Sequence, residues 1–146
     1  DHRDLHSFPT RRSSDLLCAC DTVLVPLQCE FYSLEGLSQL VESIRLVKKR
    51  YNPNIDIEGI LFTMFDGRLN LTQQVVREVK KHFADKVFNT VIPRNVRISE
   101  APSFGKPVIY FDGSSRGAEA YELLAAEMLS RHKAEDKVKK NQKEAK

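Results

Sequence analysis

The sequence predicts an α/β fold in which helices flank a mostly parallel sheet, and two observations lead to this prediction. Short runs rich in β-branched and apolar residues recur at residues 21–28, 57–65 and 87–93. The longer segments between them carry apolar residues at helical spacing, so each strand is expected to reach the next through a right-handed helical crossover. Such sheets bind ligands at the carboxyl ends of their strands, and functional residues are therefore expected in the loops that follow the strands.

The first expected strand, DTVLVPLQ at residues 21–28, is an apolar run of the kind that is covered on both faces of a sheet. The helix after it is expected to begin at Ser33, whose hydroxyl can cap the amino terminus. Its last turn holds the basic residues 48–50, which suit the negative end of the helix dipole. The sequence YNPN at residues 51–54 should stop this helix.

The second strand leads through the turn DGRLN to another helix, which Thr72 can cap and which should reach Phe83. The remaining elements are expected in this order: a third strand at 87–93, a brief strand in PVIYF at 107–111, and a last helix from about Ser115 to Arg131.

The formal net charge of +3 does not indicate a nucleic-acid-binding protein, because of where the charge lies. Residues 17–131 hold 14 basic and 14 acidic side chains, whereas residues 132–146 hold six lysines against three acids. We interpret residues 132–146 as a Lys-rich solvated tail. No apolar run approaches the roughly 18 residues that a membrane span needs.

Cysteine and histidine usage predicts no metal site. The three cysteines have no partners at zinc spacing, and His2 and His6 lack a third ligand nearby. The thiols are expected to stay reduced, as in a cytosolic protein.

The loop after the third strand, residues 93–106, is long for a connection between a sheet and a helix. Long ordered loops often carry function, so this one is a candidate surface for a ligand or a partner. The alternative is an inert crossover punctuated by proline and glycine.

Three stretches closely resemble the carboxyl-terminal half of the ParA/Soj chromosome-partitioning ATPases: VPLQCEFYSLEGLSQL, LFTMFDGRLNLTQQVVREVKKHF and VIPRNVRISEAPSFGKPVIYFDGSSRGAEAYELLAAEML. The resemblance spans about residues 17–129. It implies a partial deviant P-loop NTPase fold whose first strands are missing, with residues 17–131 as the ParA-like half. It also implies a cytoplasmic, nucleoid-associated parent ATPase that binds ATP and Mg²⁺, forms a homodimer with ATP, and binds nonspecific DNA and a ParB-like partner.

The phosphate-binding loop of that family is not found in this chain. No G-x-x-x-x-G-K-[ST] motif occurs, and the Gly-Lys pair Gly105-Lys106 precedes Pro107, which has no backbone N–H for a phosphate. No catalytic residue is assigned, and the chain alone is expected to be inactive as an ATPase.

Residues 1–16 match nothing in the family. The sequence FPTRRSSDL can be reverse-translated into a common sequencing-library adapter, and we interpret residues 1–16 as a non-native artefact. A secretory signal would need an apolar core, and a basic arm would be neutralised by the three aspartates of this segment.

The resemblance assigns a base-binding site at the expected sheet edge. It implies that an adenine ring packs against four residues: Met64, Pro93, Arg94 and Asn95. The alternative for Met64 is that it only packs in the core.

The resemblance also assigns Arg68 and Arg97 to nonspecific DNA binding. Both follow strands at the same sheet edge, so they could form one patch although the domain is formally neutral. The alternative is that each arginine is solvated or paired with Asp66 or Glu100.

Two other functions remain open. A MinD-like or iron–sulfur-carrier ATPase would share the fold, but the former needs an amphipathic terminal helix and residues 132–146 offer only Val138 as an apolar anchor. No CxxC stands where a bridging cluster would require it. The isolated chain could also be an inert truncated binding module.

Overall fold

The computed structural model describes the backbone of residues 11–144 and the side chains of residues 15–134 and 137. His2, His6 and most of the segment interpreted as non-native lie outside these residues. The chain divides into two compact units. The first contains residues up to Leu61 together with Gly67–Val87, and the second contains Phe62–Asp66 together with the residues from Phe88 onward.

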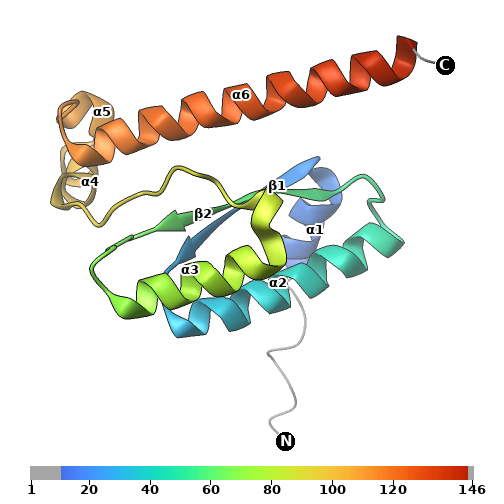
Figure 1. Ribbon diagram of the computed structural model, residues 1–146, viewed down its shortest axis with the longest axis horizontal. Coiled ribbons are helices and arrows are strands. Elements are labelled where there is room, and N and C mark those ends of the chain that lie inside the picture. The colour runs from blue at the N-terminus through green and yellow to red at the C-terminus, as the bar shows by residue number, and fades with distance from the viewer. Residues whose placement is uncertain (1–10, 145–146) are drawn as a thin grey trace, which may run out of the picture. The chain divides into compact units, whose positions relative to one another are not determined.

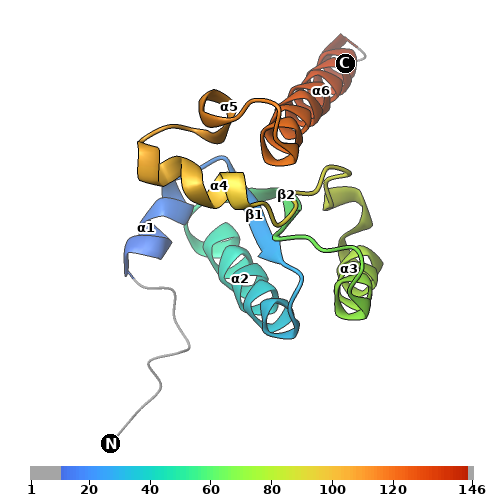
Figure 2. The same ribbon diagram turned by 90° about the vertical axis from the view of Figure 1, so that its left-hand side faces the viewer.

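The first unit is a small α/β layer. Strands β1 and β2 form a two-stranded parallel sheet, and helices α2 and α3 pack against each other beside it (Figures 1 and 2). Its elements, in chain order, are α1 (Arg11–Ala19), β1 (Thr22–Gln28), α2 (Phe31–Arg50), β2 (Asp56–Thr63, which ends in the second unit), α3 (Asn70–Phe83) and the short 3₁₀ helix η1 (Ala84–Lys86).

The core of this unit follows the predicted periodicities. Every residue of β2 from Gly59 to Phe62 is buried, as expected of a central parallel strand. The helices contribute their apolar stripes at helical spacing: Leu37, Ile44 and Val47 from α2, and Val75 and Val79 from α3. The crossover helices thus bury one face each and leave their charged faces exposed.

β1 differs from the prediction that it is covered on both faces. Its burial alternates along the strand, with Val25 and Leu27 buried and Leu24 36% exposed. In the described part of the chain β1 pairs only with β2, so it is an edge strand with one covered face.

The predicted helix starts are wrong by two residues. α2 begins at Phe31, and the backbone N–H of Ser33 already donates to the Glu30 carbonyl at 3.1 Å, so Ser33 lies in the first turn. α3 begins at Asn70, and Thr72 is 2% exposed inside it. Burial of the Thr72 side chain, rather than capping, therefore explains its position.

α1 was not predicted from the sequence. It covers residues 11–19, and its carboxyl end is fixed by Asn52, which follows α2. The Asn52 side-chain amide donates to the carbonyls of Leu17 and Cys20 at 3.3 and 2.7 Å. The predicted stop of α2 at YNPN is confirmed, because that helix ends at Arg50.

The second unit is helical apart from the end of β2. Its helices are α4 (Val96–Glu100), the 3₁₀ helix η2 (Ala101–Phe104), α5 (Val108–Phe111) and α6 (Arg116–Glu144). The prediction of a strand in PVIYF is wrong: the Phe111 N–H donates to the Pro107 carbonyl at 3.0 Å, and residues 108–111 form the single helical turn α5. The fixed φ of Pro107 suits the position before a helix.

α6 begins as expected but ends later than predicted. The Ser115 hydroxyl accepts from the Ala118 N–H at 3.2 Å and caps the helix. The helix does not stop at Arg131 but continues to Glu144. None of the helices that the structure describes has both the length and the apolar character of a membrane span.

The predicted third strand at residues 87–93 does not form a continuous strand. Only its two ends make parallel bridges, Val87 with Ile60 and Pro93 with Phe65. Between them the backbone N–H groups of Asn89 and Thr90 donate to a carboxylate of α6, each at 2.8 Å, instead of joining a ladder. The direction of this segment was predicted correctly, and its regular pairing was not.

That carboxylate belongs to Glu127 and accepts four hydrogen bonds in the second unit. Besides the two backbone donors, the Thr90 hydroxyl donates at 2.7 Å and the Arg131 guanidinium at 2.8 Å. The Arg131 guanidinium also lies 4.1 Å from the centre of the buried Phe88 ring. We call Glu127, Asn89, Thr90 and Arg131 the Glu127 clamp.

The clamp shifts the acid–base equilibrium of its carboxyl group. Burial raises the pKa of Glu127, but the hydrogen bonds from Asn89, Thr90 and Arg131 outweigh it and lower that pKa from 4.5 to about 2. Because the pKa is lower in the folded state, the clamp stabilises the fold above pH 4.5, and this contribution is lost as the pH falls toward 2.

We therefore predict that the Glu127 carboxyl carbon titrates near pH 2 in an NMR pH titration of the chain. Glu127→Gln should lower the free energy of opening of the second unit by about 2 kcal/mol at neutral pH, measured by amide hydrogen exchange of buried residues. The difference between the variant and the wild type should shrink below pH 4.5. A Glu127 carboxyl that titrates at its ordinary pKa would contradict the clamp.

Candidate functional site

The candidate site lies where β2 ends, and a short ladder of backbone hydrogen bonds forms it. The Ile92 N–H donates to the Phe62 carbonyl at 2.9 Å, and the Phe65 N–H donates to the Ile92 carbonyl at 3.0 Å. The Arg94 N–H then donates to the Phe65 carbonyl at 3.2 Å. This pairing brings Met64 and Pro93 to one edge, as the sequence predicted.

Met64 has an unusual backbone. Its φ of 50° is the only positive φ of a non-glycine residue among the described residues. The left-handed region costs a residue with a side chain on the order of 1 kcal/mol, and such outliers cluster at functional sites. The side chain is 43% exposed, so Met64 is not a simple core residue.

Asn95 has a structural role that the sequence analysis missed. Its side-chain oxygen accepts from the N–H groups of Arg97 at 2.9 Å and Ile98 at 3.4 Å, and so caps α4. An Asn before a helical turn was the available signal for this cap. Because the oxygen is used in the cap, the side-chain amide nitrogen is the group of Asn95 that suits a ligand acceptor.

α6 lies directly behind Asn95. A Cβ at Gly117 would stand 3.3 Å from the Asn95 Cγ and 2.5 Å from the Ile98 Cγ1, so only glycine lets the helix come this close. Pro93 is half-buried and Arg94 is exposed beside it. We call Met64, Pro93, Arg94 and Asn95 the base wall.

Arg97 is held by two carboxylates. Its guanidinium lies 2.9 Å from Glu100, one of the partners considered from the sequence, and 3.2 Å from Asp112. The Arg97 side chain is still 53% exposed. The pairing with Asp112, 15 residues away, had no signal in the sequence.

Arg68 belongs to the first unit, whereas Arg97 belongs to the second. It lies exposed in the turn between β2 and α3. The structure describes each arginine within its own unit, and their membership of one patch stays a prediction.

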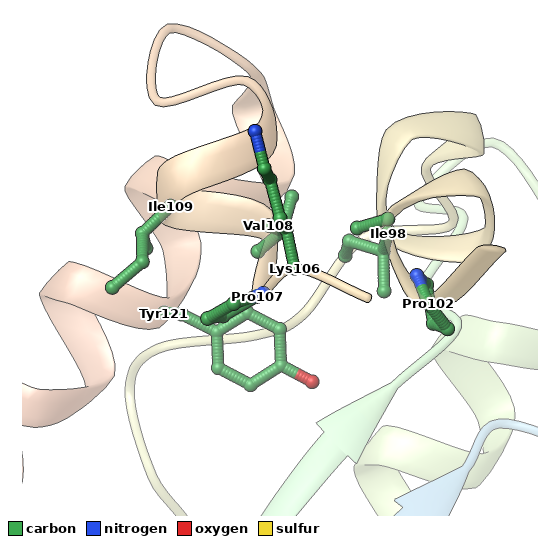
Figure 3. A pocket seen from close by; sticks show the side chains of 8 residues that line it. Ile98, Pro102, Lys106, Pro107, Val108, Ile109 and Tyr121 are labelled. Carbon is green, nitrogen blue, oxygen red and sulfur yellow. The ribbon is translucent and has the colours of Figure 1, made fainter. Parts of the chain in front are cut away.

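The second unit also contains an apolar pocket that sequence reasoning missed. It has a volume of about 350 Å³ and is lined by residues from α4 to α6, among them Ile98, Pro107 and Tyr121. Figure 3 shows the Lys106 side chain at this pocket, extended away from the Tyr121 ring. None of the base-wall residues lines it.

The residues of the site fit an adenine base better than a complete nucleotide. The base wall offers an apolar thioether, the flat face of a proline and a side-chain amide, which suit a flat heterocycle. By contrast, no group of three His, Cys, Asp or Glu among the described side chains is placed to hold a metal ion. A flat base is therefore the kind of ligand that these four side chains suit.

Known proteins are similar to this chain over most of its length. The chain is 61% identical over 114 residues to the sporulation initiation inhibitor protein Soj of Bacillus subtilis, a match that covers 78% of this chain and 45% of that protein. It is 56% identical over 115 residues to the chromosome partitioning protein ParA of Myxococcus xanthus, covering 79% and 41%. The chain thus spans less than half the length of these relatives.

A solved structure shows the same fold. Cobyrinic acid a,c-diamide synthase from Mycobacterium smegmatis, with bound ADP and magnesium, superposes with a TM-score of 0.60 at 29% identity. The match covers 80% of this chain and 41% of that one. It confirms the predicted P-loop NTPase-like α/β fold with a parallel sheet and flanking helices.

The family model of the CobQ/CobB/MinD/ParA nucleotide-binding domain matches residues 4–108. That range contains both sheet strands and all four residues of the base wall. Together with the 61% identity to Soj, it shows that the chain belongs to the CobQ/CobB/MinD/ParA family of nucleotide-binding domains and is similar to its ParA/Soj chromosome-partitioning members.

Proposed function

We propose that this chain is the base-binding and DNA-binding part of a ParA/Soj-like ATPase that acts in chromosome or plasmid segregation. The observation that carries the proposal is the base wall: the left-handed, exposed Met64 stands at the same edge as Pro93 in a nucleotide-binding family. In this proposal residues 17–131 form the ParA-like part and residues 1–16 are non-native, although the family model already matches from residue 4.

The base wall acts by shape and by a few polar groups. Pro93 is fixed by its parallel bridge to Phe65, and Asn95 is fixed by its cap on α4, so neither residue has to be ordered when a base arrives. Met64 provides a polarisable contact for a ring face. Preorganised contacts of this kind favour a flat base over a flexible ligand.

Hydrolysis needs a phosphate-binding loop, and the sequence of this chain contains no G-x-x-x-x-G-K-[ST] motif. ATP and Mg²⁺ are the cofactors of the proposed parent ATPase, in which the metal and a phosphate-binding loop neutralise the charge that develops during phosphoryl transfer. In this proposal the site for ATP and Mg²⁺ is incomplete in this chain.

DNA binding is proposed for Arg68 and Arg97. Exposed ion pairs contribute only about 0–1 kcal/mol, so a DNA phosphate can replace Glu100 and Asp112 as partners of the half-exposed Arg97. Two arginines give modest affinity in one protomer, and an ATP-bound homodimer doubles their number. A ParB-like partner and a cytoplasmic, nucleoid-associated location complete the proposal.

The first prediction is that the purified chain hydrolyses ATP no faster than a buffer blank, with Mg²⁺ present. The expected cause is the missing phosphate-binding and metal-binding groups. Phosphate release should be measured after a second chromatographic step. Turnover that stays with the chain through that step would contradict this prediction, because the chain would then bind and cleave the phosphates without a phosphate-binding loop.

The second prediction concerns the base alone. AMP and ATP should bind the chain with similar, weak affinity, within about a factor of three. The reason is that the base wall contacts only the adenine that both nucleotides share, and no phosphate loop is present to favour the triphosphate. In NMR titrations the Met64 methyl group and the Arg94 and Asn95 backbone amides should shift. CMP is the matched control, and equal shifts with CMP would argue against a base site.

The third prediction concerns DNA and uses a chimera of residues 17–146 with the amino-terminal part of B. subtilis Soj. In the ATP-bound chimera, Arg68→Ala and Arg97→Ala should each weaken binding to unrelated DNA sequences alike. Each should flatten the slope of log K against log salt by about one unit per contact per protomer.

Arg94→Ala is the control in the same chimera, because Arg94 is assigned to the base wall. It should lower nucleotide affinity before it changes the salt slope. Unchanged DNA affinity in both the Arg68 and the Arg97 variant, with dimerisation intact, would mean that the DNA site lies elsewhere.

A further inference from the structure

The segment that carries most of the base wall, residues 89–95, is anchored to α6 at both of its ends. At one end, the Asn89 and Thr90 N–H groups donate to Glu127. At the other end, Asn95 packs against the first turn of α6 at Gly117. Figure 1 shows this segment running along α6 toward α4.

The two contacts have matching lengths. Glu127 follows Gly117 by ten positions in α6, which is about 15 Å along the helix axis at 1.5 Å per residue. An extended segment from Thr90 to Asn95 spans about 17 Å at most. The segment is therefore long enough to join the two contacts, and it runs in the opposite direction to α6. Because it is held at both ends, we expect a shift at the Glu127 end to affect the position of Pro93.

The Glu127 end depends on one side chain. At Asn89 and Thr90 the backbone has left the sheet, and the Glu127 carboxylate takes the place of a neighbouring strand. The carboxylate is itself held by Arg131, and the Glu127 side chain is only 14% exposed. Loss of its charge would weaken the hydrogen bonds from two backbone N–H groups and one hydroxyl, and would weaken the contact with the Arg131 guanidinium.

We propose that Glu127 is a positioning residue for the base wall: from α6 it holds the Asn89–Asn95 segment in register, and so sets nucleotide affinity without touching the nucleotide. This inference rests on the proposed function, in which the base wall receives adenine. It assigns to α6 a role in nucleotide binding that family membership does not provide.

The test compares Glu127→Gln with Glu122→Gln in the full 146-residue chain. Both variants remove one carboxylate from α6, but Glu122 is exposed and outside the clamp. Glu127→Gln should weaken AMP binding about five- to tenfold, whereas Glu122→Gln should leave it unchanged within a factor of two. AMP is the probe, and the NMR shift of the Met64 methyl group is the readout.

A second readout separates positioning from general loss of structure. In Glu127→Gln the amides of Arg94 and Asn95 should exchange faster along with those of Asn89 and Thr90, while exchange in the first unit, read at Val75 and Val79, stays unchanged. If Glu127→Gln does not fold, Thr90→Val takes its place. It removes one donor, keeps the carboxylate and Arg131, and should weaken AMP binding two- to threefold.

The outcomes distinguish the two proposals. If AMP shifts none of the base-wall signals in the wild type, the proposed base site is wrong, and the proposed positioning role of Glu127 is then wrong as well. If AMP binds the wild type and the Glu127 and Thr90 variants equally well, the base site stands and the positioning role is overturned. Faster exchange confined to Asn89 and Thr90 would also overturn the positioning role, because the clamp would then act only locally.

Discussion

The candidate site depends on the short parallel pairing between residues 62–65 and 92–94. Three backbone hydrogen bonds fix the register in which Pro93 pairs with Phe65, and they hold Met64 in the turn where β2 ends. Parallel pairing leaves the last residues of both segments at one edge, which is where α/β proteins place their ligands. Without this pairing Met64 would share no common surface with Pro93, which follows it by 29 residues in the sequence.

The same segment shows how backbone N–H groups can be satisfied without a neighbouring strand. Backbone N–H groups that leave a sheet bond to water or to another acceptor of the protein. Here one carboxylate of α6 accepts from two consecutive N–H groups and from the Thr90 hydroxyl. The helix therefore replaces a strand as the neighbour of residues 89 and 90, and this couples a functional loop to a long helix.

The sequence was sufficient for features that repeat along the chain and insufficient for features made by single distant contacts. Apolar runs and helical stripes located β1, β2, α2 and α3, because burial of many residues at one period outweighs any single side chain. PVIYF has high β-propensity, yet a run of four residues after Pro107 closes a helical turn. The pairing of Thr90 with Glu127, 37 residues away, follows no local rule. For the site, the sequence predicted the sheet edge at which β2 ends. The left-handed backbone of Met64 and the Asp112 partner of Arg97 could be seen only in the structure.

Arg97 shows why net charge is a poor guide to the proposed DNA contact. The formal excess of +3 lies in the residues after Arg131, whereas Arg97 sits between two carboxylates. A phosphate at Arg97 would have to replace Glu100 and Asp112, and both pairs are exposed enough for this exchange to cost little. Asp112 also accepts from the Ser114 hydroxyl at 2.9 Å in the connection from α5 to α6, so it keeps a partner when the arginine leaves. DNA binding at this position would thus be an exchange of anionic partners around one guanidinium, and its strength would follow the salt concentration more than the net charge of the chain.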